Sequence, residues 1–161
     1  MSALATDPLA NPRVLIDRVY GYVAYRIGDG PDAEDVTSEV FVRALRYRGS
    51  YDPAKGQPIT WLTGIARTVL IENGQAPQTL GEDALPALVE PSQEERTDER
   101  LALTDALAHL SERDRELLAL RYGADLKAKQ IAGLADMDTH AVEVALSRAL
   151  ARLREIVGDD L

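Results

Sequence analysis

The stretch that decides the fold is "KQIAGLADMDTHAVEVALSRALARLREIV", residues 129–157, which reads as a short helix, a tight turn and a long helix. Ile131 would lie on the inner face of the first helix, and Val142 and Leu146 would pack back against it from the second. Asp136 takes the turn position where glycine is usual, and aspartate is one of the few other residues that tolerate a left-handed backbone. The spacing predicts a helix-turn-helix, although an αα-hairpin used only for packing gives the same pattern.

The rest of the chain also shows helical periodicity. Apolar residues at helical spacing, with a proline at the first position, predict helices at residues 12–27, 31–47 and 58–72. Two further helices are predicted between residue 96 and the short helix of the turn motif. The sequence therefore predicts an all-α protein.

Several residues stand where helix ends need a capping group. Asn11 is a candidate N-cap of the first helix, and Ser111 with Asp114 forms a capping-box pattern. Gly123 is a plausible C-terminal stop for the helix that follows Ser111. Asp138 would cap the long helix of the turn motif.

Composition excludes several kinds of chemistry. The chain has no cysteine, so disulfides and thiolate metal sites are excluded, and two histidines, His109 and His140, cannot build a zinc site alone. No catalytic constellation is present, so we expect neither an enzyme nor a cofactor. Without an 18-residue apolar run or a signal-peptide pattern, we expect a cytoplasmic protein that does not insert into a membrane.

Charge divides the chain into three parts. The formal net charge of −9 is the wrong sign for a protein that grips DNA by charge alone. Residues 1–76 carry a net charge of −1 and residues 109–161 a net charge of −2, whereas residues 77–108 carry −6. Most of the acidity therefore lies in the middle.

This distribution predicts two small helical domains joined by a flexible, acidic linker that contains proline and glycine. We place the first domain at residues 10–74, the linker at residues 75–95 and the helix-turn-helix domain at residues 96–158. The linker could be a solvated tether, or its charge could mimic nucleic acid.

Three motifs in order resemble the extracytoplasmic-function group of bacterial sigma factors. They are "DAEDVTSEVFVRALR" (residues 32–46), "YDPAKGQPITWLTGIART" (residues 51–68) and the long stretch "LSERDRELLALRYG…LREI" (residues 110–156). The first two resemble sigma region 2 and the third resembles region 4. The resemblance implies a factor that binds bacterial core RNA polymerase, directs promoter-specific initiation at the −10 and −35 elements of promoter DNA, and is controlled by an anti-sigma factor.

The resemblance also assigns residues to each contact. The polymerase-docking helix is matched by Asp35, Thr37, Glu39, Val40 and Arg43. The segment that holds the −10 element is matched by Tyr51, Lys55, Thr60, Trp61, Arg67 and Thr68. The −35 reader is matched by Lys127, Lys129, Gln130, Thr139, His140, Glu143, Val144, Ser147, Arg148 and Arg152.

The residue chemistry is compatible with these roles and leaves alternatives open. Asp35 and Glu39 lie one turn apart beside valines, which suits a mixed docking stripe, but exposed carboxylates can equally be solvated surface. Tyr51 offers a face for stacking an unpaired base. Trp61 follows the periodicity of its helix and fits the core better than a base platform. His140 could donate to a phosphate or be an exposed turn residue.

The sequence departs from the family pattern in two places. Thr68 stands where asparagine is usual, and no basic cluster follows it; Glu143 and Val144 stand where basic and serine residues are common. Glutamate can accept a hydrogen bond from the N4 amino group of cytosine, and valine can touch a thymine methyl group.

The cations that remain for phosphates are few, namely Lys127, Lys129, Arg148 and Arg152. Four phosphate contacts give a log K against log salt slope of roughly −3.6, which is weak for a stand-alone binder. We expect that the free protein binds duplex DNA poorly and that the holoenzyme binds it specifically.

The sequence also bears on three other functions. A sigma-like adaptor would bind polymerase or an anti-sigma factor without reading promoters. A helix-turn-helix repressor usually dimerises, and no extra dimerisation helix is visible. A small-molecule enzyme is disfavoured because the sequence shows no catalytic constellation.

Overall fold

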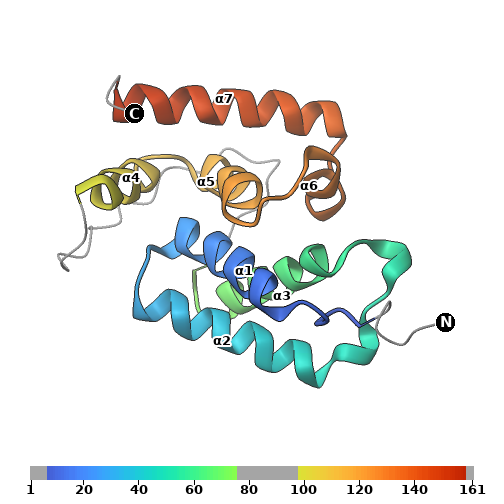
Figure 1. The fold of residues 1–161 in the computed structure, drawn as a ribbon. Coiled ribbons are helices and arrows are strands. Elements are labelled where there is room, and N and C mark those ends of the chain that lie inside the picture. Colours follow the sequence, from blue (N-terminus) through green and yellow to red (C-terminus); the bar gives the residue numbers. More distant parts are fainter. Residues whose placement is uncertain (1–6, 76–97, 159–161) are drawn as a thin grey trace.

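A computed structural model describes residues 7–75 and 98–158 of the chain, and the regular structure in these two ranges is entirely helical. The helices form two layers, one from each range (Figure 1). The prediction of an all-α fold is confirmed. The linker predicted for residues 75–95 lies, apart from Gln75, outside the described residues.

The first layer contains three α-helices, α1 (Pro12–Ile27), α2 (Pro31–Arg46) and α3 (Pro58–Glu72). Two short 3-10 helices, η2 (Arg48–Ser50) and η3 (Pro53–Lys55), connect α2 to α3. Each α-helix has proline near its first position, where the missing amide hydrogen costs nothing, and the predicted bounds agree with the observed ones within a residue.

The expected cap of α1 is wrong in one respect. Asn11 occupies the N-cap position, but its side chain makes no capping hydrogen bond. The helix start is therefore favoured by the fixed backbone conformation of the proline at the next position and not by a side-chain cap.

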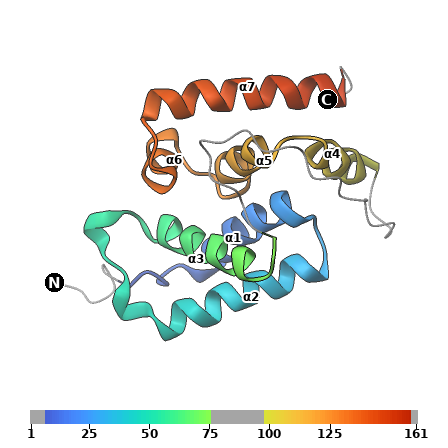
Figure 2. The same ribbon diagram turned by 180° about the vertical axis from the view of Figure 1, so that it is seen from behind.

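The second layer contains α4 (Asp98–Ala108), α5 (Glu112–Leu118), the π-helical turn η4 (Ala119–Gly123), α6 (Ala128–Ala135) and α7 (Thr139–Val157). In both views α7 is the outermost helix, and α4, α5 and α6 lie between it and the first layer (Figures 1 and 2).

The predicted helix-turn-helix is present as α6, a turn and α7. Asp136 adopts the left-handed conformation, with φ 54° and ψ 48°, as the turn requires. The side chain of Asp138 caps α7 by accepting a hydrogen bond from the amide of His140. Ile131 and Val142 are fully buried, and this places the two helices against each other as expected.

The start of α5 differs from the predicted capping box. Ser111 accepts a hydrogen bond from the amide of Asp114 at 3.1 Å, which is half of that motif. The Asp114 carboxylate instead accepts from Arg152 of α7 at 2.8 and 3.0 Å. Asp114 therefore links α5 to α7 and does not cap α5.

The two layers share one hydrophobic core. Its first-layer members include Val19, Tyr22 and Leu62, and its second-layer members include Leu120 and Ile131. A smaller cluster, built around Leu107, Leu110, Leu118 and Leu153, joins α4, α5 and α7 within the second layer. The layers consequently pack together through apolar side chains, with α1 lying directly against η4 and α5.

Within the described ranges, no helix is long and apolar enough to cross a membrane.

Candidate polymerase and promoter interfaces

The outer face of α2 presents charged and apolar side chains to solvent. Asp35 and Glu39 are exposed. Arg43 donates to Glu39 at 3.0 Å and lies 2.5 Å from Glu72 of α3, and these hydrogen bonds, the one to Glu72 first, raise the pKa of Arg43. Val42 is also exposed on this helix, as are Leu45 and Tyr47 nearby. The face has the mixed character expected of a docking surface.

Two residues assigned to this docking face are instead internal. Val40 is fully buried in the core of the first layer. Thr37 is also buried, and its hydroxyl donates to the carbonyl of Ala33 at 2.7 Å. Neither side chain is available for a direct contact in this structure, because each points inward from the helix; Asp35, Glu39 and Arg43 remain candidates.

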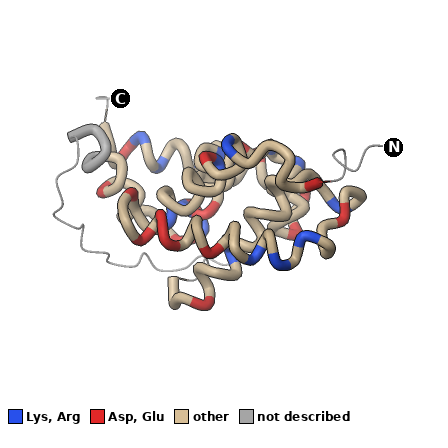
Figure 3. Tube along the Cα trace, turned by 60° about the horizontal axis from the view of Figure 1, so that its bottom comes forward, with Lys and Arg blue, Asp and Glu red and all other residues tan. Residues whose placement is uncertain are grey.

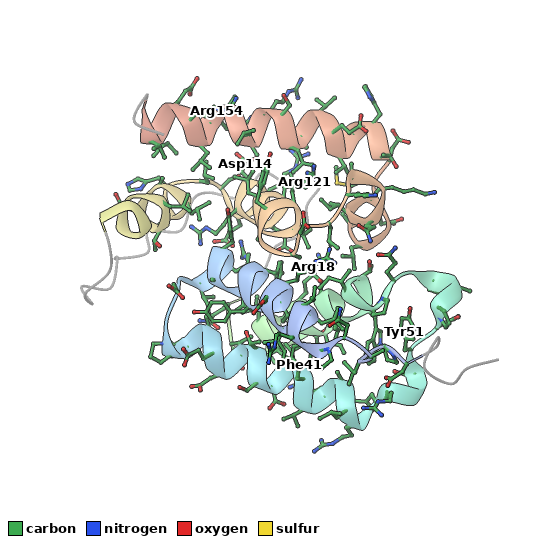
Figure 4. All side chains as sticks on the ribbon, viewed as in Figure 1. Arg18, Phe41, Tyr51, Asp114, Arg121 and Arg154 are labelled. Atoms are coloured by element: carbon green, nitrogen blue, oxygen red, sulfur yellow. The ribbon has the colours of Figure 1, made fainter. Side chains whose placement is uncertain are left out.

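The loop before α3 is held by its own hydrogen bonds. Tyr51 donates to the carbonyl of Gly56 at 2.8 Å, and Asp52 accepts from the amide of Ala54 at 3.0 Å. The ring centroids of Tyr51 and Trp61 lie 5.5 Å apart at an interplanar angle of 59°. Trp61 is half-buried and packs against the core, as its periodicity predicted. Tyr51 lies at the edge of the first layer (Figure 4).

Arg67 is half-buried and directed toward the second layer, although the resemblance assigns it to the −10 element. Its Nε lies 3.0 Å from the Glu116 carboxylate, and its Nη1 donates to the carbonyl of Leu134 at 3.2 Å. These contacts direct it toward the second layer, so it cannot bind phosphate in this arrangement. Thr68 is exposed, and its hydroxyl donates to the carbonyl of Gly64.

One cavity of 910 Å³ lies between the Tyr51–Trp61 loop and α6. Residues predicted for both promoter elements line it: Tyr51, Lys55, Thr60, Trp61 and Thr68 from the first layer, and Lys127, Lys129 and Gln130 from the second. Gln130 also joins the layers, because it donates to the side-chain oxygen of Gln57 at 3.2 Å. In this arrangement these two sets of residues face each other across the cavity.

The outer face of α7 carries the remaining predicted −35 residues. His140, Glu143, Ser147, Arg148 and Arg152 are exposed on it, and Thr139 and Val144 are half-buried. Arg152 is not a free cation, because Asp114 holds it at 2.8 Å. Basic and acidic residues are both scattered along the trace of the molecule (Figure 3). The helix can therefore offer base contacts but has little unpaired positive charge.

A buried ionic cluster lies between the layers and was not predicted. Glu116 of α5 is fully buried, and it accepts from the Tyr22 hydroxyl at 2.7 Å. Its carboxylate lies 3.5 Å from Nε of Arg26 and 3.0 Å from Nε of Arg67, and Arg26 also pairs with Glu112. We call Tyr22, Arg26, Arg67, Glu112 and Glu116 the interlayer cluster.

Burial dominates the electrostatics of this cluster. Desolvation raises the pKa of Glu116, and the two arginines lower it only in part. Desolvation and the neighbouring Glu116 charge raise the pKa of Tyr22 well above its usual value. The one sequence signal for this site is an acid directly before the apolar run "LLAL", residues 117–120.

The layers touch at backbone level where two glycines cross. A Cβ atom on Gly21 of α1 would lie 2.4 Å from the carbonyl oxygen of Gly123, and one on Gly123 would lie 2.6 Å from that of Gly21. Since real Cβ atoms do not approach so closely, this crossing requires glycine on both sides.

In the described ranges, no group of three or more histidine, aspartate or glutamate side chains is placed to hold a metal ion.

Comparison with known proteins assigns each layer to a family model. Residues 13–73 match Sigma-70 region 2, and residues 100–153 match Sigma-70, region 4. The chain is 32% identical over 152 residues to the ECF RNA polymerase sigma factor BldN of Streptomyces coelicolor, with 89% of this chain and 58% of BldN covered. It is 26% identical to the ECF RNA polymerase sigma factor SigM of Bacillus subtilis, covering 89% of this chain and 91% of SigM.

A solved structure has the same fold. The sigma factor RpoE, in complex with the anti-sigma factor NepR from Bartonella quintana, superposes with a TM-score of 0.67 at 19% identity, covering 92% of this chain and 95% of RpoE. The chain thus spans little more than half of BldN but nearly all of SigM and of the RpoE chain. Two family models in the order of the two layers, together with these relatives, show that the chain belongs to the extracytoplasmic-function group of the sigma-70 family.

Proposed function

We propose that the protein is a sigma factor that binds bacterial core RNA polymerase in the cytoplasm and directs promoter-specific transcription initiation. One observation carries the proposal: a single chain presents a mixed charged and apolar face on α2 and, on the opposite layer, the exposed reading face of a helix-turn-helix. In this proposal α2 docks on the polymerase, the segment from Tyr51 to Thr68 contacts the −10 element, and α6 with α7 contacts the −35 element.

The −35 contact depends on base recognition more than on charge. Glu143 lies in the N-terminal part of α7, the part of a recognition helix that meets base edges, and its carboxylate suits the N4 amino group of cytosine. Val144, beside it, suits a thymine methyl group. Arg148 is the exposed cation one turn further along for the phosphate backbone.

The affinity missing from these contacts would come from the polymerase. When α2 holds the chain on the enzyme, binding of the helix-turn-helix to nearby DNA becomes nearly intramolecular, and its effective concentration rises to the millimolar range for a short flexible connection. A chain with a net charge of −9 therefore need not bind DNA tightly alone.

We also propose control by an anti-sigma protein. RpoE, which shares the fold, was solved in complex with the anti-sigma factor NepR. A partner of this kind could cover the exposed apolar side chains Val42, Leu45 and Tyr47, which polymerase would otherwise meet.

The test is run-off transcription with purified bacterial core polymerase on a library of genomic fragments. We expect new transcripts that begin downstream of one shared two-block motif, and none from core polymerase without the protein. If the chain neither copurifies with the core enzyme nor produces new start sites, the proposal is wrong.

A second candidate is a sigma-like adaptor that binds polymerase but does not read promoters. The observation that favours it is that Arg67 and Arg152, two cations assigned to DNA, are engaged by Glu116 and Asp114. Glu143→Ala separates the two functions, because it should change promoter choice in a reader and leave transcription unchanged in an adaptor.

A further inference from the structure

The helix α7 is held on the second layer by different side chains at its two edges. The middle of its underside is formed by Ala145 and Ala149, which are buried and small. With about 100° of rotation for each residue, Leu146 and Leu150 fall along one edge of this underside, and Arg152 falls at the other. Both leucines are half-buried and pack against the core clusters. Arg152 is therefore a polar contact at the edge opposite to the leucines.

Asp114 meets Arg152 at this edge from α5. The Nη1 atom of Arg152 donates to both carboxylate oxygens of Asp114, at 2.8 and 3.0 Å. Figure 4 shows Asp114 directed from α5 toward α7. The side chain of Asp114 is 4% exposed and that of Arg152 is 53% exposed. A charged hydrogen bond to a buried carboxylate holds two helices together more firmly than an ion pair between two exposed side chains.

The neighbours of Asp114 fix α5 itself. Ser111 caps the first turn of α5. The next residue after Asp114, Arg115, is buried and donates from Nε to the carbonyl of Leu107 in α4 at 3.0 Å. Because α5 is held in this way, Asp114 is a fixed anchor for α7.

Glu143, the proposed base contact, lies on the opposite side of α7 from Arg152. The two residues are nine positions apart, which places them about 180° apart around the helix axis. A side-chain end lies about 6 Å from the axis, so a rotation of about 10° moves it by about 1 Å. Hydrogen-bond lengths vary by only about 0.5 Å, so such a rotation is enough to lose a contact to a base edge.

We propose that Asp114 is a positioning residue for −35 recognition. Through Arg152 it fixes the rotation of α7 about its own axis, and this rotation decides which base pair Glu143 and Val144 reach. Asp114 itself touches no DNA, because it is buried beneath α7. The inference rests on the proposed function for the identity of the DNA element, and it gives Arg152 a role inside the protein.

The first test is transcription with core polymerase from promoters substituted at each −35 position. Glu143→Ala identifies the base pair that Glu143 reads. At this base pair we expect a preference of about 5- to 150-fold in the parent chain. Asp114→Asn keeps the side-chain volume but removes the charge, and the preference should fall to about twofold or less. The preference at the −10 element should stay as in the parent, because the proposed −10 segment lies in the first layer.

Substitutions of Arg152 break the same pair from its exposed end, where the fold tolerates change better. Arg152→Ala should lose the −35 preference as Asp114→Asn does, and the double variant should lose no more than either single variant. Arg152→Lys keeps a cation for Asp114 and should retain the preference. If Arg152 only bound a phosphate, Arg152→Ala would weaken all promoters equally and leave the preference unchanged, and this result would overturn the proposal.

Two controls separate positioning from a general loss of stability. Arg115→Gln removes the contact between α5 and α4 at the adjacent buried position, so it should lower the melting temperature and keep the −35 preference. Asp105→Asn makes the same chemical change as Asp114→Asn at an exposed site of α4 and should alter neither quantity. If Arg115→Gln loses the preference as fully as Asp114→Asn, the positioning role is wrong.

A last measurement follows α7 in the free protein, without polymerase or DNA. Spin labels at Ser38→Cys on α2 and Ala141→Cys on α7 are both exposed, and the chain has no other cysteine. Ala141 lies at the same edge of α7 as Arg152. We expect Asp114→Asn to shift or widen the distribution of distances between the labels, and Asp105→Asn to leave it unchanged. An unchanged distribution in Asp114→Asn would overturn the inference whatever the transcription result, whereas failure of the parent chain to direct transcription would count against the proposed function alone.

Discussion

Replacing the buried carboxylate of Glu116 by a neutral amide should destabilise the packing of the two layers against each other. Glu116→Gln preserves the volume and an oxygen that can accept from Tyr22, but it removes the charge that faces Arg26 and Arg67. An arginine left without its partner in a buried site is costly, because its desolvation is no longer compensated.

The free-energy cost of Glu116→Gln follows from the burial and the remaining partners of the two arginines. Breaking a fully buried pair by removing one partner costs about 3–5 kcal/mol. Arg26 keeps Glu112 as a partner, and the side chain of Arg67 is 21% exposed, so the lower end, about 3 kcal/mol, applies. This corresponds to a shift of roughly 150-fold in the equilibrium between packed and separated layers, at 1.4 kcal/mol for each factor of ten.

Since the protein has no cysteine, Ser38→Cys on α2 and Ala151→Cys on α7, both exposed, give two labelling sites. The assay is the distance between the two labels, measured for Glu116→Gln and for Glu155→Gln. Glu155 is an exposed glutamate of α7 and undergoes the same chemical change. A double-mutant cycle with Arg67→Gln adds a second readout, since removing both partners should cost less than the sum of the single changes. If Glu116→Gln behaves like Glu155→Gln, or if the cycle is additive, the interlayer cluster does not hold the layers together.

Further predictions concern single residues. Glu143→Ala should change promoter preference at one base pair by about 1–3 kcal/mol, measured by transcription from promoters mutated at that position. Arg148→Gln should reduce the salt slope of holoenzyme binding by about 0.9, whereas Arg152→Gln should change it little and should lower the melting temperature, because Arg152 is paired with Asp114. Leu62→Ala in the shared core should lower the free energy of unfolding by about 2–5 kcal/mol in denaturant titrations.

The helices could be predicted from the sequence because their signals are local. Proline at the first positions of α1, α2 and α3 and the periodic apolar residues set their bounds, and Asp136 predicted the left-handed turn before α7. These features depend on residues a few positions apart, so they can be predicted from the sequence without knowing how distant segments pack.

The pairing of charges could not be predicted in the same way. A sequence shows that Arg67 and Arg152 are cations, but not that Glu116 and Asp114 hold them. Tyr22 and Glu116 are 94 residues apart, and their hydrogen bond exists only because the layers pack. Likewise, Thr37 and Val40 were assigned to docking by position, whereas the helix turns both into the core.

The π-helical turn at Ala119–Gly123 has a consequence for insertions and deletions. It is closed by a hydrogen bond from the amide of Ala124 to the carbonyl of Ala119, one residue wider than an α-helical turn. Each residue of an α-helix advances the chain by about 100° around its axis. Loss of one residue here would restore ordinary helical phase and rotate α6 and α7 by about that angle about the axis of α5, so a single-codon deletion would reorient the helix-turn-helix.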